Sequence, residues 1–104
     1  MADEHGMFID GTWVPSESGA VFDAHSPSTG EVIGTVPEGT RRDAQRAIAA
    51  ANAVWRDWAG RSAFDRAAAL SRVAELVRER REDLARTLTL DQGKPLRAEA
   101  HEEV

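Results

Sequence analysis

Residues 7–14 read Met-Phe-Ile-Asp-Gly-Thr-Trp-Val, and they place Asp10-Gly11 between two short runs of β-forming residues. A two-residue type I′ turn needs positive φ at both central positions, and Asp-Gly adopts them at low cost. The pattern therefore predicts an antiparallel hairpin with strands over 7–9 and 12–14. Pro15 lacks a backbone N–H and should end the second strand or confine it to a sheet edge.

Outward from this hairpin, two more strands are predicted over residues 21–25 and 31–36. They are joined by Ser26-Pro27-Ser28-Thr29-Gly30, in which proline presets φ and glycine accepts a left-handed position. Residues 7–39 thus predict strands and turns, whereas residues 40–104, rich in Ala, Leu, Arg and Glu, predict helices. The predicted fold class is α/β, with two β-hairpins followed by three to four helices.

The first helix should begin at Thr40, a good N-cap residue, and stop at Gly60. Its apolar residues recur at helical spacing, which predicts a buried face; they are Ala44, Ala47, Ile48, Ala51, Trp55 and Trp58. The second helix follows Ser62-Ala63-Phe64-Asp65, which resembles a capping box with Asp in place of Glu or Gln. Its predicted buried residues are Ala67, Leu70, Val73, Ala74 and Val77.

A third helix is predicted from Glu82 to Asp91, with Leu84, Ala85 and Leu88 turned inward. Gly93 is a natural C′ residue, and Pro95 can open a further helix at its first position. That last helix reaches Val104 without a C-cap signal. We therefore expect residues 1–104 to be an N-terminal portion that is truncated at its C-terminal end.

The composition excludes several classes of protein. The net charge is −5, from 18 acidic and 13 basic residues, so the basic footprint of a nucleic-acid-binding protein is missing. There is no cysteine, which removes disulfides, thiolate metal sites and a thiol nucleophile. Residues 1–6 lack the basic start and apolar run of a signal peptide, and no apolar stretch is long enough to span a bilayer. We expect a cytoplasmic protein with no membrane partner.

Several motifs invite a functional interpretation, but a structural one is favoured for each. Gln92-Gly93-Lys94 lacks the first glycine and the Ser or Thr of a phosphate loop, so a helix stop is expected. Solvated or locally bonded side chains are expected for the histidines, core packing for two tryptophans and a solvent-facing side for the acidic end: His5, His25 and His101; Trp55 and Trp58; Glu99, Glu102 and Glu103. Neither a nucleophile elbow nor a dinucleotide Gly-rich loop is present. No catalytic, cofactor-binding or metal-binding residue is predicted.

Four stretches, in this order, resemble one family. Residues 7–14 resemble its opening hairpin, and residues 26–33 resemble its Asn-Pro…Thr-Gly-Glu hairpin, with Ser26 in place of the usual Asn. Residues 43–58 resemble its Ala-rich helix ending in Trp, and residues 88–96 resemble its Gly-Lys-Pro-Leu segment. The family is the NAD(P)-dependent aldehyde dehydrogenases, and the sequence around residues 88–96 is most similar to that of the succinate-semialdehyde dehydrogenase branch.

This resemblance implies an α/β enzyme in which residues 1–104 are the N-terminal part of the cofactor domain. It implies a homo-oligomer that oxidises an aldehyde to a carboxylic acid with NAD or NADP, through a cysteine thiohemiacetal and a thioester that water hydrolyses. The family's cysteine, asparagine and cofactor motifs map onto no residue of this chain, and Asn52 lies within a predicted helix. The Asp matching Asp91 supplies a backbone carbonyl to a monovalent cation in some members, but a helix-end role is favoured here because of Gly93.

Two alternatives stay open. The chain could be a non-catalytic helical interaction module, since a partial domain would expose apolar surface. It could also belong to an acyl-CoA-linked or phosphate-linked reductase of the same superfamily, although the Thr-Gly-Glu and Gly-Lys-Pro segments favour the hydrolytic dehydrogenases. In the favoured interpretation, the chain alone neither oxidises aldehydes nor binds NAD tightly, and open strand edges make it poorly soluble.

Overall fold

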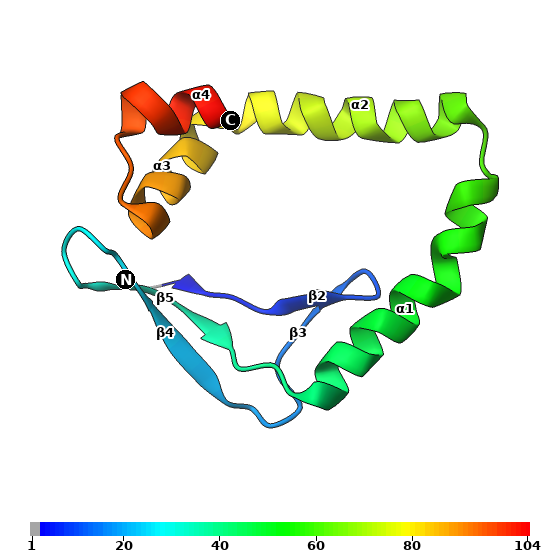
Figure 1. Ribbon diagram of the computed structural model, residues 1–104, viewed down its shortest axis with the longest axis horizontal. Coiled ribbons are helices and arrows are strands. Elements are labelled where there is room, and N and C mark those ends of the chain that lie inside the picture. Colours follow the sequence, from blue (N-terminus) through cyan, green and yellow to red (C-terminus); the bar gives the residue numbers. More distant parts are fainter. Residues whose placement is uncertain (1–2) are drawn as a thin grey trace. The chain divides into compact units, whose positions relative to one another are not determined.

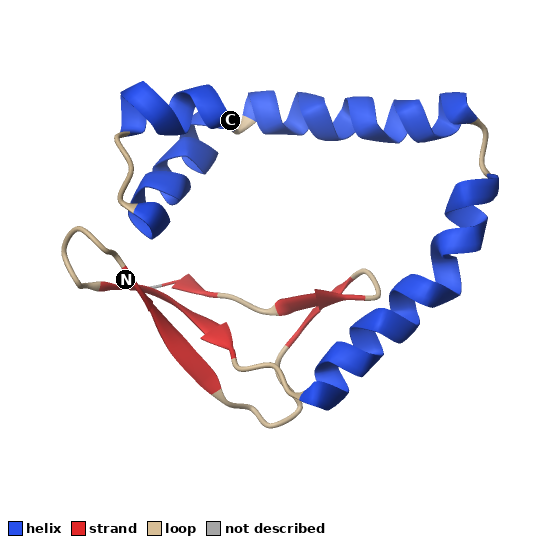
Figure 2. Ribbon diagram, viewed as in Figure 1, coloured by secondary structure: helices blue, strands red, loops and turns tan. Residues whose placement is uncertain are grey.

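The computed structural model describes residues 3–104, and its strands precede its helices as expected for the predicted α/β chain (Figures 1 and 2). The elements are β1 (Asp3–Glu4), β2 (Met7–Ile9), β3 (Thr12–Val14), β4 (Val21–His25), β5 (Val32–Pro37), α1 (Arg41–Gly60), α2 (Ala63–Glu79), α3 (Arg81–Gln92), the π-helical turn η1 (Leu96–Ala100) and α4 (His101–Glu103). Two compact units are present: residues 3–24 with 32–60, and residues 25–31 with 61–104.

The predicted hairpin of the first unit is confirmed in position and register. Strands β2 and β3 are antiparallel, with Met7 opposite Val14 and Phe8 opposite Trp13. Asp10 and Gly11 both have positive φ, 52° and 74°, as a type I′ turn requires. The rings of Phe8 and Trp13 are tilted against one another at 5.0 Å between centroids, so this cross-strand pair stabilises one face of the hairpin.

The second predicted hairpin is also present, since β4 and β5 are neighbouring antiparallel strands. Strand β5 begins and ends one residue later than the predicted 31–36. One strand was not predicted: β1 pairs in parallel with β5, and the backbone N–H of His5 donates to the carbonyl of Thr35 at 3.0 Å. The backbone of His5 is therefore tied to β5. The pairing uses backbone groups alone, and the polar residues of β1 carry no strand pattern.

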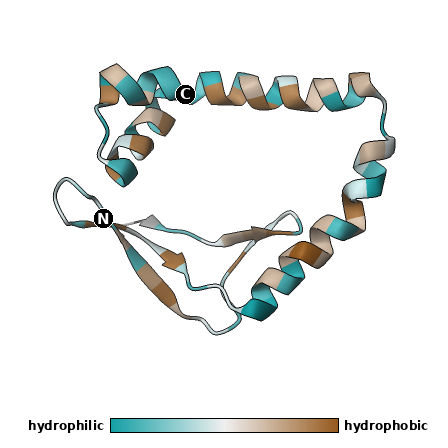
Figure 3. Cartoon of the chain, viewed as in Figure 1, coloured by the Kyte–Doolittle hydropathy of each residue, from teal (hydrophilic) through white to brown (hydrophobic). Residues whose placement is uncertain are grey.

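Helix α1 begins directly after Thr40, as predicted, and Gly60 is its last residue. Brown bands along α1 in Figure 3 mark its most hydrophobic residues. The prediction that this stripe forms a core is wrong for its large members, because Ile48 is 69% exposed, Trp55 49% and Trp58 41%. A helix buries its apolar face only where another element covers it. Within the first unit, α1 contacts β2, but this contact leaves Val54 54% exposed and the two tryptophans of the helix open.

In the second unit, the predicted start of α2 and the predicted end of α3 are both confirmed, and each has a local sequence signal. The backbone N–H of Asp65 donates to Ser62 Oγ at 3.0 Å, which caps α2. Gly93 ends α3 with φ 73°, and its N–H donates to the carbonyl of Thr89 at 2.8 Å. Pro95, with ψ 129°, flanks η1 and does not occupy the first helical position that was predicted for it.

The core of the second unit contains few buried apolar side chains. Ala85 of α3 and Ala100 of η1 are fully buried, consistent with close packing between these two elements. The apolar face predicted for α2 stays open, with Leu70 64% and Val73 56% exposed, and Leu84 of α3 is 39% exposed. Burial predicted from periodicity therefore holds here for the small residue Ala85, but it is wrong for these three larger side chains.

Candidate functional site

The residues considered as possible catalysts or ligands do not converge. His5 follows β1, His25 ends β4 and His101 begins α4. The Nε2 atom of His101 lies 3.1 Å from Glu82 Oε2, which is a local pairing along the α3–α4 packing. Over residues 3–104, no group of three or more His, Cys, Asp or Glu side chains is arranged to hold a metal ion. No helix within the same residues is long and apolar enough to cross a membrane.

The Gln92-Gly93-Lys94 segment and the acidic end form a structural contact. Lys94 Nζ lies 2.6 Å from Glu103 Oε1, and the lysine side chain is only 17% exposed. An alanine Cβ built at Gly93 would lie 3.0 Å from Pro27 Cγ, so the end of α3 packs directly on the 25–31 turn. These contacts are those of a helix stop, as the sequence predicted. A helix-end role was the favoured interpretation of Asp91, and Gly93 ends α3 two residues later.

The one buried cluster of polar side chains that the described residues assemble surrounds Asp43, in the first turn of α1. Asp43 is 2% exposed, and Ser16 beside it is 4% exposed. Its Oδ2 accepts hydrogen bonds from Ser16 Oγ at 2.9 Å, from the Thr40 backbone N–H at 3.0 Å and from the Glu17 backbone N–H at 3.2 Å. In return, the Asp43 backbone N–H donates to Thr40 Oγ1 at 3.2 Å. Thr40 and Asp43 thus form a reciprocal capping box.

These donors favour the ionised form of Asp43. The backbone N–H of Thr40 is the main cause that holds the pKa of Asp43 below its ordinary value of 3.8. Burial acts in the opposite direction, while the Ser16 hydroxyl and the Glu17 N–H lower the pKa further. A carboxylate at a helix N-terminus is also stabilised by the helix dipole.

The Asp43 cluster anchors one segment of the first unit to another. Its acceptor oxygens already receive hydrogen bonds from donors within the chain, and a second link joins Thr40 Oγ1 to Glu17 Oε1 at 2.8 Å. The cluster ties the loop after β3 to the start of α1. Thr40 was predicted as the N-cap of α1 but Asp43 was not predicted as its partner, although Thr40-x-x-Asp43 has the same spacing as Ser62-x-x-Asp65.

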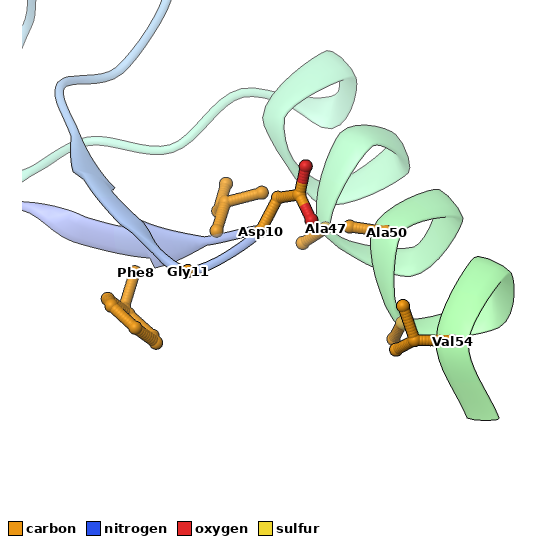
Figure 4. Close-up of a pocket in the computed structure, with 8 residues that line it drawn as sticks. Phe8, Asp10, Gly11, Ala47, Ala50 and Val54 are labelled. Atoms are coloured by element: carbon orange, nitrogen blue, oxygen red, sulfur yellow. The ribbon is translucent and has the colours of Figure 1, made fainter. Parts of the chain in front are cut away.

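A groove of about 450 Å³ lies between the β2–β3 hairpin and α1 (Figure 4). Its walls are mostly apolar or small, and the lining residues are Phe8, Ile9, Asp10, Gly11, Ala47, Ala50, Ala51 and Val54. A second groove, of about 380 Å³, is lined by Glu4, His5, Gly6, Trp13, Val14, Pro15, Val21 and Pro37. Each groove carries a carboxylate and neither is lined by Lys or Arg.

Neither groove fits a nicotinamide dinucleotide. A pyrophosphate group binds at backbone N–H groups of a glycine-rich turn at a helix N-terminus. In the described residues the positive-φ glycines stand singly, Gly11, Gly19 and Gly30 in turns and Gly93 at a helix end. The carboxylates of Asp10 and Glu4 would repel a phosphate. These two grooves therefore lack the groups that hold a pyrophosphate.

Comparison with known proteins gives a consistent match. The model of the aldehyde dehydrogenase family matches residues 13–104. The 3-sulfolactaldehyde dehydrogenase of Pseudomonas putida is 44% identical over 97 residues, which cover 93% of this chain and 20% of that protein. The acylating methylmalonate-semialdehyde/malonate-semialdehyde dehydrogenase of Rattus norvegicus mitochondria is 40% identical over 90 residues, which cover 86% of this chain and 17% of that protein.

Solved structures agree with the predicted fold. The succinate-semialdehyde dehydrogenase of Burkholderia pseudomallei matches with a TM-score of 0.91 and 45% identity, over 95% of this chain and 20% of that one. The NAD-dependent aldehyde dehydrogenase of Sinorhizobium meliloti matches with a TM-score of 0.92 and 36% identity, over 99% and 21%. The fold prediction of an aldehyde dehydrogenase-like N-terminal part is thereby confirmed. The chain spans about a fifth of the length of these relatives.

Proposed function

The chain belongs to the aldehyde dehydrogenase family, and we propose that it is the N-terminal scaffold of an enzyme that oxidises an aldehyde to a carboxylic acid with NAD(P)+. The observation that carries the proposal is the match of residues 13–104 to the family, together with a span of only 20% of its relatives. Family chemistry uses a cysteine thiolate as nucleophile. This chain has no cysteine, so the thiol and the cofactor pocket would come from polypeptide outside these residues.

The role proposed for these residues is positional. The Asp43 anchor fixes the loop after β3 on the start of α1, and the Gly93 stop fixes the end of α3 on the 25–31 turn. Both contacts join parts of the chain that are far apart in sequence. Buried hydrogen bonds and close packing of this kind hold a scaffold rigid, which the precise geometry of an enzyme site requires.

An exchange experiment tests this role. Residues 1–104 replace the matching fifth of the Burkholderia succinate-semialdehyde dehydrogenase, to which this chain is 45% identical. The chimera should form NAD(P)H from succinate semialdehyde, and the Burkholderia protein lacking that fifth should not. A chimera with native far-UV circular dichroism and native mass that shows no turnover would contradict the proposal. The 104-residue chain alone should form no NAD(P)H under the same conditions.

We further propose a short aldehyde with an anionic end as the substrate of the enzyme that contains this segment. Three of the relatives above are named for sulfolactaldehyde, methylmalonate or malonate semialdehyde, and succinate semialdehyde, all of which carry a sulfonate or carboxylate. That enzyme should have a higher kcat/KM for succinate semialdehyde than for the cationic betaine aldehyde. A reversed preference would overturn this assignment and leave aldehyde oxidation itself standing.

The relative named as acylating keeps a CoA-linked release open as the second catalytic route. The Thr29-Gly30-Glu31 and Gly93-Lys94-Pro95 segments favour hydrolysis. If release is hydrolytic, NADH formation does not depend on added CoA; if it is acylating, turnover requires CoA and an acyl-CoA accumulates. Product analysis by mass spectrometry distinguishes the two.

A non-catalytic interaction module is the alternative from another class. It is favoured by the large apolar side chains that the described residues leave open, such as Ile48 at 69% and Phe64 at 87% exposure. If this alternative holds, the purified chain melts cooperatively as a monomer and the exchange chimera is inactive. We also propose a cytoplasmic homo-oligomer for the whole enzyme, to be checked by cell fractionation and by light scattering.

A further inference from the structure

We draw no further inference here: the strongest candidate, the apolar groove between the β2–β3 hairpin and α1 lined by Phe8, Ile9, Ala47 and Val54 (Figure 4), carries no proposal because nothing in the structure shows what covers it.

Discussion

Replacing Gly93 with alanine should destabilise the second unit by about 2–4 kcal/mol, from two separate causes. The first is conformational, because Gly93 has φ 73° and an L-residue in the left-handed region costs roughly 1–2 kcal/mol. The second is steric, because the new Cβ would lie 3.0 Å from Pro27 Cγ and the proline ring cannot rotate away. Overpacking of this kind costs about 1–3 kcal/mol. Alanine also restricts the unfolded chain, which offsets roughly 0.5 kcal/mol.

Two other glycines provide matched controls. Gly30 has φ 75° but nothing within 4 Å of a built Cβ, so Gly30→Ala carries the conformational cost alone, about 1 kcal/mol. Gly60 is the last residue of α1, has no positive φ and also has nothing within 4 Å. Gly60→Ala should therefore be neutral or stabilise the chain by up to about 0.5 kcal/mol through helix propensity.

The assay is urea unfolding followed by far-UV circular dichroism, with the three variants compared with the parent chain at equal concentration. The expected order of stability is Gly60→Ala, parent, Gly30→Ala and then Gly93→Ala. If Gly93→Ala and Gly30→Ala lose the same free energy of unfolding, the close packing of Gly93 on Pro27 is wrong. If Gly93→Ala loses none, the left-handed helix end is wrong as well.

Three further predictions concern the capping sites and the open surface. Because the pKa of Asp43 is lowered in the folded chain, its ionised form contributes stability that is fully present above pH 3.8 and is lost as the pH falls through the lower pKa of the folded state. The urea midpoint of the parent chain should therefore exceed that of Asp43→Asn at neutral pH, and the difference between the two midpoints should shrink in acid. Ser62→Ala should cost about 1 kcal/mol, whereas Ser71→Ala on the exposed side of α2 should cost almost nothing, by the same urea assay. Ile48→Gln should reduce aggregation in dynamic light scattering without lowering the urea midpoint, since Ile48 is 69% exposed; an unchanged particle size would contradict this.

The features that sequence predicted well are those in which neighbouring residues decide the backbone. Asp10 and Gly11 adopt the two positive φ angles that their own chemistry permits, and the register of the hairpin follows from the turn. Ser62 caps α2 from three residues away, and Gly93 ends α3 through its own φ. In each case, the information lies within a few residues of the feature.

The features that were missed depend on residues far apart in the chain. Strand β1 pairs with β5 about 30 residues later, using backbone groups that any sequence possesses. The Thr40-x-x-Asp43 spacing was a usable signal, but the burial of Asp43 depends on Ser16 and Glu17, which are 27 and 26 residues away. Because the loop after β3 is polar, it shows no periodic pattern from which its contact with the start of α1 could be predicted.

The stripe on α1 shows a different limit. Periodicity correctly groups Ile48, Trp55 and Trp58 on an apolar face, but it cannot state what covers that face. These three side chains are 41–69% exposed, because the described residues supply no second layer over them. The helix over these residues is present as predicted, so the error concerns the burial of the face and not the helical pattern.

The residues that identify the family are those that shape the backbone, and they differ in kind from side chains that would contact a substrate. The stretches that carry the resemblance include Asp10-Gly11, Thr29-Gly30 and Gly93-Lys94-Pro95, and each contains a turn or a helix end with a positive-φ residue. Such positions restrict the path of the backbone, so they identify a scaffold whatever reaction the enzyme performs. A substrate is recognised by side chains that contact it, and in these residues the one buried polar cluster bonds to its own chain. Membership of the family therefore follows from these residues, whereas the substrate proposed above rests on the names of the relatives.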